Sequence, residues 1–290
     1  MLLTVFTPTF NRAHTIARTF NSLIQQTFKD FEWLIVDDGS TDSTEKVVEG
    51  FIESSDLNIR YIKKENGGKH TAYNLALEQA AGELFFVVDS DDWLPDNSLS
   101  DIASLSEKIM DDDSVGGVIA LKMTPDRAVI GKKFRQENYF ATFRQLELTG
   151  QGGERSIVFK TKIARKFPFP VIRGERFMPE GVVYDKFNQD YKFVIKNNCL
   201  TTCEYQSNGL SSAPRKLMLK YPGGYTLYYR TRIDMAVSLT ERIGYIIRYN
   251  MFRNLYKGDD IVAYKGAYKN MTIVLNTLTP LIIRHYLAKL

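Results

Sequence analysis

Short apolar runs alternate with segments of helical periodicity over roughly the first third of this 290-residue chain. The apolar runs are 3–7, 31–36, 57–62 and 83–88. Between the first two, residues 13–27 repeat their apolar side chains at helical spacing. Strands that alternate with helices in this way favour a parallel sheet wrapped by helices and joined by right-handed crossovers. We therefore predict an α/β, Rossmann-like fold whose first strand ends at Pro8.

Polar clusters follow three of these predicted strands. The clusters are residues 7–12, 37–42 and 89–92. In open parallel sheets, ligands bind beyond the carboxyl ends of the strands. Because the topology brings these three ends to one edge of the sheet, we expect the clusters to form one ligand site.

The last cluster is strongly acidic, with Asp89, Asp91 and Asp92 in four residues. Like charges this close together are costly unless a cation lies between them, and carboxylate oxygens suit Mg²⁺ or Mn²⁺. The other interpretation is a turn and helix cap, for which Asp and Ser are common residues.

Composition excludes several classes of protein. The chain is 44% hydrophobic and 25% charged, which favours a folded protein over a disordered one. It has no apolar stretch of the roughly 20 residues that a membrane span needs, and its start does not read as a secretory signal, so we expect a cytoplasmic protein. Its two cysteines, Cys199 and Cys203, have no partners for a zinc site, and we expect buried or incidental thiols.

Residues 215–290 differ in composition from the rest of the chain. They hold 13 of the 38 Lys and Arg residues but only 4 of the 34 Asp and Glu residues, and ten of the sixteen tyrosines. We therefore predict a domain over 1–214 and a basic, Tyr-rich helical extension over 215–290. Residues 230–249 have apolar side chains on one helical face, which suits either a packed helix or a helix lying at the inner face of the cell membrane. Nucleic acid is the weakest candidate partner, because no stacking motif accompanies the charge.

Six ordered motifs together resemble the family 2 glycosyltransferases, which have the GT-A fold. They are Thr7 to Arg12, Gln25 to Phe28, Glu32 to Asp42, Asn66-Gly67-Gly68, Gly82-Glu83 and Asp89-Ser90-Asp91-Asp92. The resemblance covers residues 1–100 strongly and 101–210 weakly. It implies inverting transfer of a sugar from a nucleotide-diphosphate donor, a UDP- or GDP-sugar, to an acceptor hydroxyl.

The resemblance also implies roles for individual positions. Residues that match the family's nucleotide-binding positions, or that could reach the diphosphate, are Thr7, Pro8, Thr9, Asn11, Asp37, Asp38, Lys69 and Asp91. Among these, Asp38 resembles the carboxylate that recognises the nucleobase, and Asp91 the one that approaches the ribose. Asp92 matches the usual metal ligand, with Asp91 as its neighbour, so Mn²⁺ or Mg²⁺ is the expected cofactor.

The catalytic base is expected in the second half of the domain, where the family usually has a Glu-Asp pair. Glu180 is our candidate, because it follows Pro179 at the start of a predicted helix, but Gly181 replaces the Asp. Asp185 and then Asp190 are the fallback bases. The resemblance favours a saccharide or lipid-linked acceptor in bacterial surface-polysaccharide assembly. A non-catalytic nucleotide- or glycan-binding module and a sugar nucleotidyltransferase remain as alternatives.

Overall fold

The computed structural model describes residues 1–204, 214–277 and 279–280 of the chain. The chain divides into two compact units: Met1–Pro168 with Lys186–Tyr205, and Phe169–Asp185 with Gln206–Leu290. The second unit thus includes Phe169–Asp185, which the predicted boundary at residue 214 assigns to the first domain. Residue 278 and residues 281–290 of the predicted extension lie outside the described residues.

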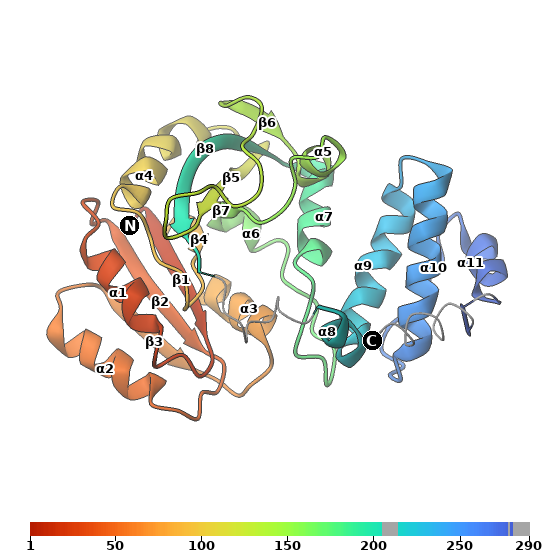
Figure 1. The fold of residues 1–290 in the computed structure, drawn as a ribbon, viewed down its shortest axis with the longest axis horizontal. Coiled ribbons are helices and arrows are strands. Elements are labelled where there is room, and N and C mark those ends of the chain that lie inside the picture. The colour runs from red at the N-terminus through yellow and green to blue at the C-terminus, as the bar shows by residue number, and fades with distance from the viewer. Residues whose placement is uncertain (205–213, 278, 281–290) are drawn as a thin grey trace. The chain divides into compact units, whose positions relative to one another are not determined.

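An eight-stranded sheet with the order β3-β2-β1-β4-β7-β5-β8-β6 forms the centre of the first unit (Figure 1). Its first four strands are β1 (Leu3–Thr9), β2 (Phe31–Asp37), β3 (Ile59–Lys63) and β4 (Leu84–Val87). β1 pairs in parallel with β2 and β4, and β2 pairs in parallel with β3. The predicted α/β fold with a mostly parallel sheet is confirmed.

The other half of the sheet mixes strand directions. Its strands are β5 (Val115–Met123), β6 (Tyr139–Ala141), β7 (Ser156–Lys160) and β8 (Lys192–Thr202). β7 lies antiparallel between β4 and β5, whereas β8 is parallel to β5. The three-residue strand β6 pairs antiparallel with β8 and is the last strand at this edge.

Helices cover the two faces of the sheet because alternate side chains of each strand point to opposite faces (Figure 1). Leu3 and Val5 of β1 belong to one buried core with side chains of α1 (Ile16–Ile24), α2 (Thr44–Ser54) and α4 (Ser98–Ile109). On the opposite face, the Phe6 ring contacts the Tyr73 ring of α3 (Lys69–Gln79). Two short helices, α5 (Phe143–Leu148) and α6 (Thr161–Ala164), complete this part.

The prediction that the first strand ends at Pro8 is wrong, because β1 continues to Thr9. Pro8 is paired in register with Val36 of β2, whereas the pairing of β1 with β4 stops at Phe6. In a strand, successive N–H groups point to alternate neighbours, and the Phe6 carbonyl accepts from Val88 on the β4 side. The missing N–H of Pro8 therefore faces the side where the ladder has already ended, and the strand loses no hydrogen bond.

The helices of the second unit are α8 (Pro214–Lys220), α9 (Pro222–Met235), α10 (Leu239–Leu255) and α11 (Lys269–Asn276), and α7 (Gly181–Asp190) contains the boundary between the units. The expected single helical face over 230–249 is interrupted, because Ser238 caps a new helix by accepting from the Glu241 N–H at 3.1 Å. The tyrosines are largely structural: Tyr249 and Tyr264 are buried in one small core, and Tyr225 in another. No helix among the described residues is long and apolar enough to cross a membrane.

Candidate functional site

Asn11 ties the loop after β1 to the loop after β2. Its side-chain oxygen accepts from the Thr41 N–H at 2.8 Å, and its own N–H donates to Ser40 Oγ at 2.8 Å. Its φ of 54° lies in the left-handed region, which Asn tolerates better than most residues. Asn11, a predicted nucleotide-binding residue, thus uses its side-chain oxygen to fix two of the three predicted loops against each other.

Asp37 and Asp38 differ in what their carboxylates do. Asp37 is fully buried, accepts from the Ser40 N–H at 2.7 Å and from the Tyr61 hydroxyl at 2.5 Å, and so holds its own loop. The Asp38 carboxylate accepts from the Lys64 ammonium at 2.7 Å. It also accepts from two successive backbone N–H groups at the start of α3, those of Gly67 at 2.9 Å and Gly68 at 2.7 Å.

These contacts explain the two glycines before α3. Gly68 has a φ of 96°, which L side chains rarely adopt, and this conformation turns its N–H onto Asp38. Both Asp38 oxygens are therefore engaged within the chain, and only a remaining lone pair is left for a ligand. The geometry fixes Asp38 just after the end of β2 as a rigid acceptor.

The end of β1 supplies a second group with spare hydrogen-bonding capacity. Thr7 Oγ1 accepts from the Trp33 indole N–H at 2.9 Å and is used internally. Thr9 Oγ1 is buried and has no hydrogen-bond partner in the described part of the chain. A buried hydroxyl without a partner is costly, so Thr9 is poised to bond a ligand at this strand end.

The acidic run, defined as Asp89–Asp92, begins with an ion pair. The Lys69 ammonium, from the first residue of α3, lies 2.8 Å from Asp89 Oδ1. Burial alone would raise the pKa of Asp89, but Lys69 and then Lys122 hold it below its usual range. Lys69, which we expected to reach a diphosphate, thus lies beside the acidic run and forms an ion pair with Asp89.

Asp92 is the most enclosed carboxylate of the acidic run, with 6% of the residue exposed. Its Oδ2 accepts from the Lys122 ammonium of β5 at 3.1 Å and from the Cys203 thiol at 3.0 Å. Burial raises the pKa of Asp92 above its usual range, although Lys122 opposes this. For Lys122 itself, burial favours the neutral amine, but Asp92 and Asp89 outweigh it and raise the pKa of the ammonium.

Asp91 lies between these two pairs and makes no such contact. Its carboxylate has neither an ion pair nor a hydrogen bond to any residue that the structure describes. The main chain around it is held by α1, since Arg18 donates to the Asp91 carbonyl at 3.3 Å and Thr19 Oγ1 to the Asp92 carbonyl at 2.6 Å. Asp91 is thus a free carboxylate on a rigid loop.

A complete protein cage for a metal is absent from the described residues, where no group of three or more His, Cys, Asp and Glu side chains could hold an ion. A Mg²⁺-type ion needs only one or two carboxylates when substrate phosphates and water fill its other positions. Asp91 meets that requirement with its free oxygens. Asp92 would have to exchange part of its contact with Lys122 and Cys203 for the ion.

Two of the three candidate bases, Glu180 and Asp185, lie in the second unit. Glu180 is exposed, and its Oε2 accepts from the Tyr184 hydroxyl at 3.3 Å. Asp185 is only 1% exposed, and both of its oxygens accept from the Arg232 guanidinium, one of them at 2.8 Å. The two carboxylates therefore differ sharply in their environment. Asp190, the other fallback base, is exposed in the first unit at the end of α7.

The replacement of the expected second acid by Gly181 has a steric reason. A Cβ at this position would lie 2.5 Å from Cε2 of the Tyr228 ring. Only glycine fits at 181 while Tyr228 keeps this position. The Arg232 guanidinium lies over the Tyr228 ring, 4.9 Å from the ring centroid. The glycine at position 181 therefore accommodates a packed cluster of aromatic and ionic side chains.

Sequence reasoning missed three cations that neutralise predicted carboxylates: Lys64, Lys122 and Arg232. Lys122 could have been recognised from the sequence, because it is the single charged residue in the otherwise apolar strand β5. A lysine in such a strand must find an anion when it is buried. Lys64 and Arg232 have no comparable signal in their surroundings.

A comparison with family models places this architecture among known proteins. The model "Glycosyl transferase family 2" matches residues 4–169, which is more than half of the chain. The chain belongs to glycosyl transferase family 2. The family predicted from the six motifs is therefore confirmed, and the matched region contains the three strand ends described above.

Individual relatives agree with the family assignment. Poly(ribitol-phosphate) beta-N-acetylglucosaminyltransferase TarS of Staphylococcus aureus is 33% identical over 150 residues, which is 51% of this chain and 25% of TarS. This chain thus matches only about a quarter of the length of that relative. The structure of S. aureus TarS 1-349 in complex with UDP-GlcNAc superposes with a TM-score of 0.63 at 21% identity and covers 100% of this chain and 88% of that one.

A second solved structure, mannosyltransferase PcManGT from Pyrobaculum calidifontis in complex with GDP-Man and Mn²⁺, has a TM-score of 0.52 at 19% identity. It covers 99% of this chain and 73% of the other. At these identities the two superpositions establish the fold, which is the GT-A fold of family 2.

Proposed function

We propose that this chain transfers a sugar from a nucleotide-diphosphate donor to an acceptor hydroxyl, with inversion at the anomeric carbon. The observation that carries the proposal is the convergence of Thr9, Asp38 and Asp91 at the carboxyl ends of three neighbouring parallel strands. Each is fixed by its loop, and each keeps hydrogen-bonding capacity for a ligand. Ligands of open α/β sheets bind at such strand ends.

The sugar donor is a UDP- or GDP-sugar in this proposal. Asp38 would accept from a nucleobase N–H, with its carboxylate orientation set by Gly67 and Gly68. Asp91 would face the ribose and the diphosphate, and Lys69 would share its charge between Asp89 and the phosphates. TarS, which has a structure with UDP-GlcNAc, and PcManGT, which has one with GDP-Man, support a nucleotide sugar without deciding between the two bases.

A divalent cation, Mn²⁺ or Mg²⁺, belongs to the proposal, with Asp91 as the first oxygen ligand from the chain and Asp92 as the second. When bound, such an ion would stabilise the negative charge that develops on the departing nucleoside diphosphate. The chain's own part is to hold the free Asp91 carboxylate rigidly, through Arg18 and Thr19, where that charge appears.

Glu180 is the proposed general base, which takes the proton of the acceptor hydroxyl. It is exposed, whereas the fallback candidate Asp185 already shares both oxygens with Arg232. A carboxylate held by a guanidinium is a poor proton acceptor, because the cation favours its charged form. This contrast supports Glu180.

The test is a transfer assay with UDP- and GDP-sugars and Mn²⁺, in which the release of nucleoside diphosphate is followed. We expect Glu180→Gln to lower turnover by about 10² or more while the sugar donor still binds, the scale of a lost general base. Asp91→Asn should weaken binding of the sugar donor instead. Binding of the donor without turnover in the unaltered chain would mean a non-catalytic binding module.

The acceptor is a saccharide or a lipid-linked saccharide in this proposal. A lipid-linked acceptor would bring the chain to the inner face of the cell membrane, and the positive charge of residues 215–290 supports contact with anionic lipid. Sedimentation with vesicles tests this point. We expect binding to vesicles with anionic lipid and none to neutral vesicles, and equal binding to both would contradict it.

A further inference from the structure

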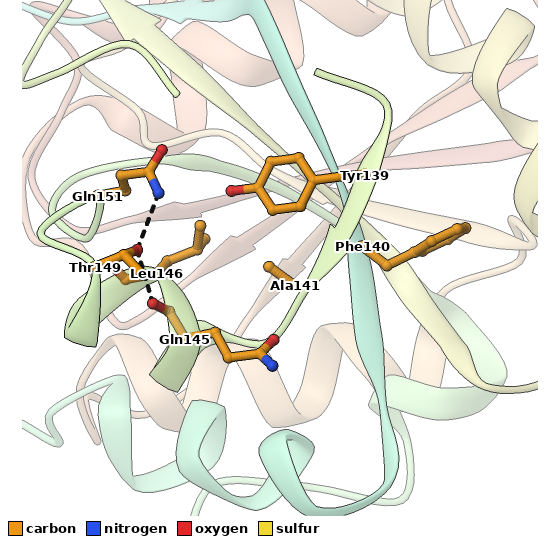
Figure 2. Close-up of a pocket in the computed structure, with 7 residues that line it drawn as sticks. All are labelled: Tyr139, Phe140, Ala141, Gln145, Leu146, Thr149 and Gln151. Carbon is orange, nitrogen blue, oxygen red and sulfur yellow. Dashed lines mark hydrogen bonds between the residues drawn. The ribbon is translucent and has the colours of Figure 1, made fainter. Parts of the chain in front are cut away.

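A pocket of about 270 Å³ lies between the edge strand β6 and helix α5 of the first unit (Figure 2). Its polar lining comes from Tyr139, Gln145, Thr149 and Gln151, and its apolar lining includes Ala141 and Leu146. The volume is just below the ~300 Å³ at which ordinary ligand pockets begin. There is room for one ring-sized molecule.

This pocket is separate from the strand ends that form the proposed sugar-donor site. In the sheet order, three strands lie between β4, which precedes the acidic run, and β6. Neighbouring strands are ~4.8 Å apart, so four steps across the sheet place β6 roughly 19 Å from β4. A ligand in the pocket would therefore not be the nucleotide.

The polar wall of the pocket is fixed before any ligand binds. Gln151 is only 8% exposed, accepts from the Arg135 N–H at 2.8 Å and donates to Thr149 Oγ1 at 2.9 Å. The Arg155 guanidinium donates to the Gln151 carbonyl at 2.8 Å, and Gln145 is held in a capping box with Thr142. These bonds set the side chains at little further entropic cost to binding.

Hydrogen-bonding capacity remains directed at the pocket. The Tyr139 hydroxyl points across it toward Gln151 (Figure 2), and no hydrogen bond links this hydroxyl to a described residue. The Gln151 amide uses one of its two N–H groups on Thr149, which leaves one donor. Ala141, Leu146 and the Tyr139 ring supply apolar surface beside these groups.

The chemistry of this lining selects a class of ligand. The lining residues carry no charged side chain, so the pocket offers nothing to neutralise a phosphate or a carboxylate. Hydroxyl and amide groups that both donate and accept, beside an aromatic ring, match a molecule with several hydroxyls and an apolar C–H face. A neutral sugar ring has both properties.

We propose that the pocket between β6 and α5 binds one neutral sugar ring of a saccharide, at a distance from the site of transfer. Its role as a holding site for an extended acceptor rests on the proposed function, whereas the binding of a sugar does not. A site about 19 Å from the strand end of β4 would hold an acceptor chain several units from its reacting hydroxyl.

The experiment is saturation-transfer NMR on the full chain with glucose, galactose and N-acetylglucosamine as probes, followed by titration of the sugar that binds best. We expect Tyr139→Phe, which removes only the hydroxyl, to weaken that sugar roughly tenfold, the scale of a lost hydrogen bond. Tyr191→Phe is the matched control, because it removes a hydroxyl of the first unit that accepts from Lys166 and does not line the pocket, and the sugar affinity of this variant should be unchanged.

Two results would overturn the proposal: no saturation of any of the three sugars by the unaltered chain, or equal affinity in the unaltered chain and in both Tyr139→Phe and Tyr139→Ala. Binding of UDP is measured in the same samples, so that a failure of the sugar pocket can be distinguished from a failure of the proposed function. Sugar binding that depends on Tyr139 in a chain that binds no nucleotide would refute the proposed function and leave the sugar pocket standing.

Discussion

Replacement of Lys122 by Met should destabilise the first unit by about 3 kcal/mol, because it leaves Asp92 buried without its cation. The two charged atoms lie 3.1 Å apart, and the side chains are only 18% and 8% exposed. At an effective dielectric constant of about 20, Coulomb's law gives roughly 5 kcal/mol at that distance. Removal of one partner of a buried pair typically costs about 3–5 kcal/mol. We take the lower end because Asp92, with its raised pKa, can escape part of the cost by binding a proton.

Urea unfolding followed by tryptophan fluorescence measures this change. The only two tryptophans, Trp33 and Trp93, both lie in the first unit, so the signal reports that unit. The double variant Lys122→Met with Asp92→Asn removes both charges and should return to within about 1 kcal/mol of the unaltered chain. Lys162→Met is the matched control, since it breaks an exposed pair with Asp113 and should change little. Equal stability losses for Lys122→Met and Lys162→Met, or no recovery in the double variant, would refute the reasoning.

Three further predictions concern other parts of the chain. Gly68→Ala should cost about 1–3 kcal/mol in unfolding free energy, because its φ of 96° is strained for any residue with a Cβ. Gly50→Ala, where a Cβ on α2 would meet open space, is the control, and thermal melting should show it neutral or stabilising. Glu32 has a pKa held low, against its burial, by bonds from Thr4, the Ala81 N–H and Arg60. Its stabilisation is therefore fully present above the unfolded pKa near 4.3 and is lost as the pH falls through the lower pKa of the folded state. The stability deficit of Glu32→Gln should stay constant from neutral pH down to about 4.3 and shrink below it. Asp185→Asn should lower the free energy of unfolding by about 3 kcal/mol, because it breaks the ion pair with the buried Arg232. Glu180→Gln should leave it unchanged. Unfolding followed by circular dichroism compares the two variants, and the opposite ranking would contradict the roles given to these carboxylates.

Much of the first unit was predictable because its strands are buried on both faces. Residues 31–36 and 83–88 are apolar apart from Glu32 and Glu83, and both ends of β2 and of β4 lie within one residue of these ranges. Parallel strands end at one edge of the sheet, so the sequence also located the polar clusters. Pro8 misled the prediction because the effect of a proline depends on which neighbouring strand its nitrogen faces, and this requires the register.

The site was less predictable than the fold, since carboxylates that look alike in sequence have different partners. Asp91 and Asp92 are adjacent, yet Asp92 accepts hydrogen bonds from Lys122 and Cys203, which are far along the chain, and Asp91 accepts from neither. Likewise, nothing local indicates that Tyr228 occupies the space that a side chain at 181 would need. Such pairings are set by tertiary packing, and the roles assigned to these residues remain proposals.

The central claim is that the ends of β1, β2 and β4 form one binding site for a nucleotide-diphosphate sugar. Isothermal titration calorimetry of UDP and GDP into the full chain, with Mn²⁺ present, tests it most directly. We predict saturable binding of at least one of the two that falls roughly tenfold or more in both Asp38→Asn and Asp91→Asn, because each variant removes a charged acceptor from a different strand end. Absence of binding by either nucleotide, or binding that neither variant weakens, would contradict the account.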